Sequence, residues 1–264
     1  MQIHLGNRRA IITGSTAGIG LAIASGLAAA GAHVTLTGRT QARVDEAIAT
    51  IAKQVPGAKL TGVVGDLGTR EGTQHLIAEV PETDILVNNL GIFEPKPFFD
   101  IPDEDWLRFF EVNVMSGIRL SRHYAQGMAK RRWGRIQFIS SESALQIPAE
   151  MVQYGTTKTA QLAVSRGLAE TMAGTGVTVN AVLPGPTRSE GVGEFFGKIA
   201  AEQGVSQDMV ERDFIATHRP TSLIKRLATV EEVANLCVYL ASEQASATTG
   251  AAMRVDGGVV RSIA

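Results

Sequence analysis

The feature that most constrains the fold is a regular alternation of short apolar runs with longer segments of helical periodicity. The short runs are rich in branched apolar residues and cover Arg9 to Thr13, His33 to Thr37, Lys59 to Val64, Asp84 to Val87, Arg135 to Ser140, Val177 to Leu183 and Ala252 to Val255. Between them lie helix-length patterns at residues 18–30, 41–54, 69–79, 103–131, 150–173 and 229–242. Because this alternation is typical of βαβ units, the sequence predicts a parallel sheet with helices on both faces.

No linker, repeat or low-complexity tract interrupts this rhythm, so we expect residues 1–264 to form a single domain. A chain of 264 residues with 44% hydrophobic content can bury a core of that size. The one departure is the glycine-containing stretch 186–226, between the sixth strand and the last helix. Long connections inside compact domains are usually functional, so this stretch is expected to serve the site.

Charge and cysteine content exclude several classes of function. The net charge of −1 gives no general attraction to nucleic acid or to an anionic membrane. No segment approaches the ~20 apolar residues that cross a bilayer, and the N-terminus lacks a secretory pattern. A lone Cys237 cannot form an internal disulfide and fits a reducing compartment. We therefore expect a cytoplasmic protein that binds neither nucleic acid nor membrane and contains no metal site.

A glycine-rich turn follows the first predicted strand. Thr13 to Gly20 reads TGSTAGIG and opens the first helix. Glycines allow a tight turn, and the helix N-terminus presents free amides to a phosphate. The spacing Gly-x-x-x-Gly-x-Gly differs from the general dinucleotide fingerprint, but its place after the first strand favours a nucleotide site over simple turn chemistry.

The end of the second strand indicates which nucleotide would bind. An acidic residue here would bind a ribose 2′-hydroxyl, whereas an arginine accommodates a 2′-phosphate. The sequence Thr37-Gly38-Arg39-Thr40 has no carboxylate, and Arg39 can clamp a phosphate with two N–H groups. NADP(H) is therefore the expected cofactor and NAD(H) the alternative. Arg39 stacking on the adenine or facing water is the other interpretation.

Polar residues also follow the third and fourth strands. In Gly65-Asp66-Leu67, Asp66 is placed to accept a hydrogen bond from an adenine amino group, to cap the next helix, or both. Asn89 can tie neighbouring strand ends together, and Gly91 allows a ribose to approach closely. The buried amide of Asn113 must be paired, because leaving it unpaired costs about 1–3 kcal/mol. It is either a structural bridge or the holder of an ordered water.

Tyr154 and Lys158 stand four residues apart in a helical pattern, so their side chains leave the same helix face. A phenol with an ordinary pKa of about 10 is a weak acid at neutral pH, and a nearby ammonium favours its ionised form. A tyrosine tuned in this way exchanges a proton with an alcohol or carbonyl oxygen. Ser141, at the end of the fifth strand, can bind that same oxygen. Taken alone, the spacing of the tyrosine and lysine also occurs by chance on solvated helices.

These residues together resemble the short-chain dehydrogenase/reductase family over essentially the whole chain. The matching motifs are Thr13 to Gly20, Asp66, Asn88-Asn89-Leu90-Gly91, Asn113, Ser141, Tyr154-x-x-x-Lys158 and Pro184-Gly185. The family usually has Ala where Leu90 stands. The resemblance implies a doubly wound Rossmann fold with a seven-stranded parallel sheet, in which 186–226 is an inserted substrate lid.

The resemblance also implies a role for each site residue. Tyr154 is the acid/base, and Ser141 polarises and positions the reacting oxygen. Lys158 holds the nicotinamide ribose and lowers the pKa of the tyrosine. Asn113 anchors a water that links this lysine to solvent as a proton relay. The implied cofactor-binding set, besides Tyr154 and Lys158, is Gly14, Ser15, Thr16, Gly18, Ile19, Gly20, Arg39, Asp66, Leu67, Asn89, Gly91, Pro184, Gly185 and Thr187.

Three functions remain open at this point. The first is an NADP(H)-dependent oxidoreductase that interconverts a ketone or aldehyde and an alcohol, for example a 3-oxoacyl compound. The alternative is a nucleotide-sensing regulatory protein without turnover, which need not keep the catalytic set. The third is a dehydratase or epimerase of the same family. Glu142 and Met151 flank the catalytic residues, and basic residues such as Arg188, Arg212 and Arg219 leave an acyl carrier or another anionic partner open.

Subunit association is expected from two of the helices. The patterns 103–131 and 150–173 carry more apolar positions than one buried face needs, among them Trp106, Phe109, Phe110, Met115, Leu162 and Val164. Such surplus apolar surface must be buried elsewhere. With the family resemblance, this predicts a homotetramer in which residues 259–264 lie near a neighbouring subunit.

Overall fold

The computed structural model describes residues 2–263, and its centre is one parallel sheet in the order β3-β2-β1-β4-β5-β6-β9. The strands are β1 (Arg9–Ile12), β2 (His33–Gly38), β3 (Lys59–Val64), β4 (Ile85–Asn88), β5 (Gly134–Ile139), β6 (Val177–Pro184) and β9 (Ala252–Val255). Each coincides with a predicted strand to within one residue at either end. The predicted parallel pairing is confirmed along the whole sheet.

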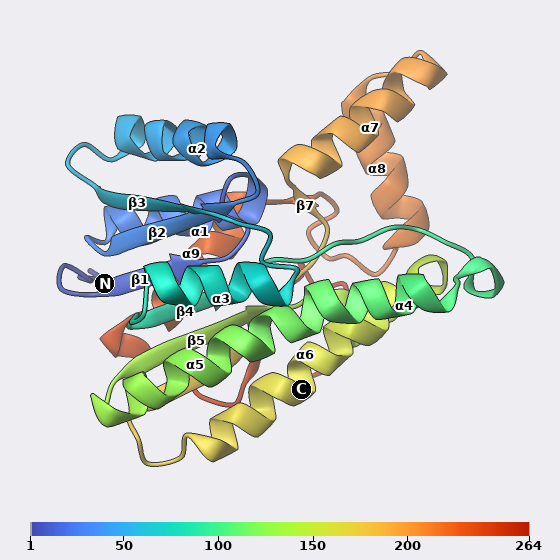
Figure 1. Cartoon of the computed structure of the whole chain (residues 1–264). Coiled ribbons are helices and arrows are strands. Elements are labelled where there is room, and N and C mark those ends of the chain that lie inside the picture. The colour runs from blue at the N-terminus through green and yellow to red at the C-terminus, as the bar shows by residue number, and fades with distance from the viewer. Residues whose placement is uncertain (1, 264) are drawn as a thin grey trace.

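Helices cover both faces of this sheet (Figure 1). One face carries α1 (Gly18–Ala29), α2 (Gln41–Gln54) and α9 (Val230–Leu240), and the other carries α3 (Arg70–Glu79), α5 (Ser116–Lys130) and α6 (Val152–Thr171). Each layer has its own buried cluster, centred on residues such as Leu27 and Val233 on the first face and Leu76 and Leu120 on the second. The doubly wound α/β fold is therefore confirmed.

The sheet changes winding direction between β1 and β4. Because all seven strands are parallel, their carboxyl ends meet at one edge, and open α/β sheets bind ligands outside that edge at such a reversal. The glycine turn after β1, the segment after β4 and the residues after β5 and β6 all begin there. The topology thus brings the predicted site residues to one place.

The sequence predicted one uninterrupted helix at 103–131, and this prediction was wrong. The structure has α4 (Asp103–Phe110), a π-helical turn at Glu111–Met115, and then α5. The widened turn contains Asn113 near its middle. Such π-turns often mark functional positions, and the contacts of Asn113 described below account for this one.

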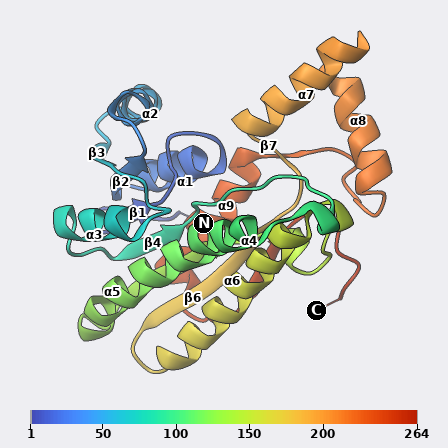
Figure 2. The same ribbon diagram turned by 45° about the vertical axis from the view of Figure 1, so that its right-hand side comes forward.

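The stretch 186–226 contains helices that the sequence did not predict. A short strand β7 (Thr187–Arg188) pairs with β8 (Ala228–Thr229), and between them lie α7 (Glu190–Gln203) and α8 (Gln207–His218). The two helices pack on each other through a separate apolar cluster: Phe196, Ala200, Val210, Ile215 and Leu227. They project from the carboxyl edge of the sheet (Figure 2).

Short 3₁₀ turns complete the described chain at Phe98–Asp100, Glu142–Ala144, Ala149–Met151 and Glu243–Ala245. Within residues 2–263, no helix is both long and apolar enough to cross a bilayer. The same residues contain no group of three or more His, Cys, Asp or Glu side chains that would hold a metal ion.

Candidate active site

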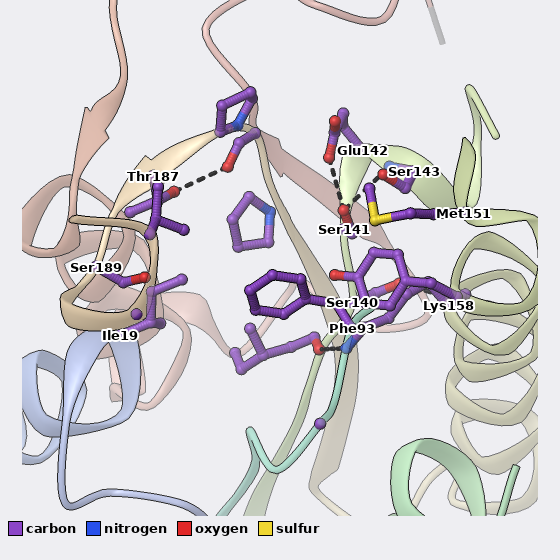
Figure 3. A pocket seen from close by; sticks show the side chains of 18 of the residues that line it. Ile19, Phe93, Ser140, Ser141, Glu142, Ser143, Met151, Lys158, Thr187 and Ser189 are labelled. Atoms are coloured by element: carbon purple, nitrogen blue, oxygen red, sulfur yellow. Dashed lines mark hydrogen bonds between the residues drawn. The ribbon is translucent and has the colours of Figure 1, made fainter. Parts of the chain in front are cut away.

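A cavity of about 530 Å³ opens at the carboxyl edge of the sheet, between the strand ends and the helices α7 and α8. Its wall includes nine of the predicted site residues: Ile19, Asn89, Gly91, Ser141, Tyr154, Lys158, Pro184, Gly185 and Thr187. Figure 3 shows Ser141, Glu142 and Lys158 on one side and Ile19, Thr187 and Ser189 on the other. The other predicted residues lie outside this wall: Gly14, Ser15, Thr16, Gly18, Gly20, Arg39, Asp66, Leu67 and Asn113.

The glycine turn has the geometry of a phosphate site. Gly14 has a φ of +62°, which favours glycine, and a Cβ at Gly20 would lie 2.3 Å from the carbonyl oxygen of Gly14. Ala17 precedes α1, and no described side chain caps the helix N-terminus, so its first amides are free for an anion. Ser15 plays a different part: its buried hydroxyl donates to the Ile12 carbonyl and accepts from the backbone of β2. It braces the turn.

At the end of β2, Arg39 is exposed and makes no hydrogen bond or ion pair with any described residue. The adjacent Thr40 caps α2 by accepting from the Arg43 amide. The guanidinium of Arg43 is already engaged, with Nη2 at 3.0 and 3.1 Å from the two carboxylate oxygens of Glu190 in α7. Arg39 is therefore the uncommitted cation at this strand end among the described residues, which fits a 2′-phosphate contact.

Asp66 does not cap α3, so that part of its prediction was wrong. The cap is Thr69, whose hydroxyl accepts from the Gly72 amide, while Asp66 Oδ1 accepts from the Gly68 amide at 2.9 Å. Asp66 is exposed and keeps acceptor capacity for an adenine amino group. The neighbouring Leu67 is buried and packs in the core.

Asn89 ties two strand ends together, as predicted. Its Nδ2 donates to the carbonyl oxygens of Thr13 and Gly14 at 2.9 and 3.0 Å, which joins the end of β4 to the glycine turn after β1. These two hydrogen bonds fix the position of the turn relative to the cavity.

Asn113 is a structural bridge. Its Oδ1 accepts from the Ile92 amide at 2.7 Å, and its Nδ2 donates to the Ile92 carbonyl and to Thr157 Oγ1, both at 3.0 Å. The side chain thereby joins the segment after β4 to α6. The backbone carbonyl of Asn113 accepts a hydrogen bond of 2.6 Å from Gln161 Nε2.

Gln161 is a residue that the sequence interpretation missed. It is 2% exposed, and its Oε1 accepts from Lys158 Nζ at 3.3 Å while its amide nitrogen contacts Asn113. One side-chain amide thus links the lysine to the backbone of Asn113, the residue that was expected to anchor a relay water. The available signal was a polar residue three positions after Lys158, on the same helix face.

Tyr154 and Lys158 lie on the same side of the cavity. Lys158 Nζ is 5.5 Å from the centre of the Tyr154 ring and donates to the Ile139 carbonyl at 2.9 Å. Burial lowers the pKa of the Lys158 ammonium to about 7. Burial also raises the pKa of the Tyr154 hydroxyl. Burial disfavours the charged form of both side chains and so opposes the predicted lowering of the tyrosine pKa by the lysine.

Ser141 belongs to a buried hydrogen-bond chain. Its Oγ accepts from the Ser143 amide at 3.1 Å and donates to Glu142 Oε2 at 2.6 Å (Figure 3). The other carboxylate oxygen of Glu142 accepts from Arg219 Nε at 2.9 Å, and both side chains of this ion pair are buried. Arg219 comes directly after α8, so the pair joins the projecting helices to the end of β5.

Two of the basic residues that left an anionic partner open are engaged inside the chain. Arg188 pairs with Glu211 of α8, and Arg219 pairs with Glu142. Of the aromatic residues near the site, Phe93 lies edge-on to Tyr154, and Phe196 lines the cavity from α7.

Comparisons with known proteins decide the family. Residues 14–260 match a family model described as enoyl-(acyl carrier protein) reductase. The uncharacterized oxidoreductase YvaG of Bacillus subtilis is 48% identical over the full length of both chains. Dehydrogenase/reductase SDR family member 4 of Bos taurus is 35% identical over 96% of this chain and 88% of that protein.

The chain belongs to the short-chain dehydrogenase/reductase family.

The fold of this short-chain dehydrogenase/reductase is matched over its whole length by a solved relative. The L-sorbose reductase of Gluconobacter frateurii, complexed with NADPH and L-sorbose, superposes with a TM-score of 0.94 at 32% identity and covers 100% of both chains. A putative gluconate 5-dehydrogenase of Beutenbergia cavernae with bound NADP has a TM-score of 0.87 at 33% identity, covering 99% of this chain and all of that one.

Proposed function

We propose that this oxidoreductase interconverts a ketone or aldehyde and an alcohol with NADP(H) as its cofactor. The observation that carries the proposal is the grouping of Ser141, Tyr154 and Lys158 on one side of a cavity. The opposite wall includes Ile19, in the first turn of α1, whose N-terminus has no side-chain cap. Solved relatives that contain NADPH or NADP support the cofactor. The phosphates would lie at α1 and the 2′-phosphate at Arg39, and the cofactor supplies or accepts the hydride.

Tyr154 is the acid/base of the proposed reaction. Its hydroxyl holds a proton at neutral pH, as an ordinary phenol does, and burial raises its pKa further. The protonated form is the one that protonates a carbonyl oxygen during reduction. In oxidation the same oxygen takes the proton of the alcohol. The positive charge of an oxidised nicotinamide would favour the phenolate that this direction needs. Pro184, Gly185 and Thr187 form the wall against which the nicotinamide would lie.

The test is NADPH oxidation on a panel of small ketones and aldehydes, combined with a tryptophan-fluorescence titration of NADPH binding. Turnover of any compound in the panel supports the proposed oxidoreductase function. Binding without turnover on every member would favour the alternative, a nucleotide-sensing regulatory protein on the same fold.

We propose a small-molecule substrate and place an acyl carrier second. A 3-oxoacyl-[acyl-carrier-protein] reductase of Aquifex aeolicus is 34% identical over 98% of this chain, so that chemistry occurs among relatives. However, Arg219 is buried in a pair with Glu142 and Arg188 pairs with Glu211, so an anionic carrier would compete with carboxylates of this chain for both guanidinium groups. The segment 186–226 acts as the lid over the smaller substrate.

Gln161 gives a prediction on pH dependence. Its carbonyl oxygen accepts from Lys158 and so favours the charged amine. In Gln161→Leu the pKa of Lys158 falls below about 7, and we expect the alkaline limb of kcat/KM to move about one unit toward lower pH. In Gln161→Glu the added carboxylate raises the pKa of Lys158 and moves the limb the other way. If both variants show the same pH profile as the wild-type enzyme, Gln161 does not influence the pKa of Lys158.

Subunit association remains a prediction. Phe109 is 1% exposed within the chain and adds nothing to an exposed apolar surface, whereas Leu107 of the same helix and Phe99 are 70% and 96% exposed. We expect sedimentation velocity at micromolar concentration to show a species heavier than one chain, with a tetramer as the proposed form. A single monomeric boundary would contradict this.

A further inference from the structure

The hydroxyl of Ser141 is already used in the folded chain. A serine hydroxyl has one hydrogen to donate, and Ser141 gives it to Glu142 Oε2 at 2.6 Å. In this arrangement its oxygen can accept hydrogen bonds, as it does from the Ser143 amide. It cannot donate to a substrate carbonyl while the bond to Glu142 remains. Polarisation of a carbonyl by Ser141 therefore costs the hydrogen bond to Glu142, unless another donor replaces Ser141 on the carboxylate.

Glu142 is held ready to accept such a group. Its carboxylate is 4% exposed, lines the cavity and is fixed through Oε1 by Arg219, which is 7% exposed. A carboxylate has about four lone-pair sites, and the described hydrogen bonds use two of them. Breaking one partner from a buried charge pair is costly, so Arg219 keeps the carboxylate in place beside the serine.

We propose, on the basis of the function proposed above, that Glu142 binds a hydroxyl group on the carbon next to the reacting carbonyl. The substrate hydroxyl donates to Glu142 Oε2, and the released hydrogen of Ser141 then turns to the carbonyl oxygen. The oxygens of an α-hydroxy carbonyl compound lie on adjacent carbons, at about hydrogen-bond distance from each other, as Ser141 Oγ and Glu142 Oε2 do. The substrate class is therefore an α-hydroxy ketone or aldehyde in reduction and a vicinal diol in oxidation.

Two other classes are disfavoured by the same geometry. A simple ketone can receive the Ser141 hydrogen only if the hydrogen bond to Glu142 is broken without replacement, and such charge-assisted bonds are the stronger kind. A 2-oxo acid would bring its carboxylate against the carboxylate of Glu142, which repels it. Both should be turned over less efficiently than an α-hydroxy ketone of the same size.

The experiment compares hydroxyacetone with butanone, which replaces the hydroxyl by a methyl group, as substrates for NADPH oxidation. The wild-type enzyme is expected to prefer hydroxyacetone in kcat/KM on the order of 10- to 100-fold. In Glu142→Gln the amide nitrogen that replaces Oε2 cannot accept a hydroxyl, so the preference should fall toward one. Because each preference compares two substrates on one preparation, loss of folded protein affects both values and cancels.

Glu150→Gln is the matched control. Glu150 also lies near Arg219, with Oε1 3.7 Å from Nη1, but it is 44% exposed and is not part of the described cavity wall. We expect this variant to keep the wild-type preference. A wild-type preference near one, or an unchanged preference in Glu142→Gln, would overturn the inference while leaving the oxidoreductase intact. If no carbonyl compound supports NADPH oxidation by the wild-type enzyme, the proposed function fails and the inference fails with it.

Discussion

Tyr154→Phe is expected to lower kcat by about 10²- to 10⁴-fold, the usual contribution of a positioned acid/base, and to leave NADPH affinity nearly unchanged. The substitution removes one oxygen and keeps the ring, which packs against Phe93 and beside the Lys158 amine. The reacting oxygen then loses its proton donor. Steady-state kinetics with NADPH measure the loss, and fluorescence titration measures the retained binding.

The matched control is Tyr239→Phe. Tyr239 lies in α9 and packs against the core cluster on the opposite layer, outside the described cavity wall. Removing its hydroxyl makes the same chemical change without touching the site, so kcat should stay within about twofold of wild type. Full turnover by Tyr154→Phe would remove this tyrosine from its role. Joint loss of turnover and NADPH binding would indicate a damaged fold instead.

The strands were predictable because the physics that makes them is local in sequence. A strand of a parallel sheet is buried on both faces, and β5 and β6, which are buried at every residue, read as short runs rich in apolar residues. The site followed from the topology: polar residues at the carboxyl ends of parallel strands meet at one edge. Ser141 and Asn89 were found in this way, at the ends of β5 and β4.

What the sequence did not reveal depends on partners far apart in the chain. The π-helical turn places Asn113 on the Ile92 backbone, 21 residues away, and no periodicity in 103–131 shows that contact. Glu142 and Arg219 are 77 residues apart, and the sequence placed one beside the catalytic serine and the other among basic residues open to an anionic partner, with no sign that they pair. The helices α7 and α8 were missed because they bury a small cluster of their own and not a face against the sheet.

The same distinction explains the pKa values. Spacing alone placed Lys158 one turn from Tyr154, and an ammonium in water beside a phenol would lower the pKa of the phenol. Burial depends on the whole fold, and here it outweighs that effect by lowering the pKa of the lysine to about 7. In the proposed reaction, the amide of Gln161 would favour the ammonium of Lys158, and the charge of an oxidised nicotinamide would favour the phenolate of Tyr154.

Arg39→Asp is expected to change the ratio of kcat/KM for NADPH over NADH by about 100-fold or more in favour of NADH. The guanidinium is exposed and uncommitted among the described residues, so its loss breaks no internal pair. A hydrogen bond to a charged group contributes about 1.5–3 kcal/mol, and the new carboxylate adds repulsion toward the 2′-phosphate. The same carboxylate can accept from the ribose 2′-hydroxyl of NADH.

Arg43→Gln separates a specific contact from a general loss of positive charge. Arg43 lies one turn further along α2 and is engaged by Glu190, so its replacement should leave the cofactor ratio within a fewfold of wild type, as expected for exposed ion pairs. A large change in Arg43→Gln with none in Arg39→Asp would transfer the phosphate contact to Arg43. That result would mean that the Arg43 guanidinium either leaves Glu190 when the cofactor binds or contacts the phosphate through the N–H groups that Glu190 does not use.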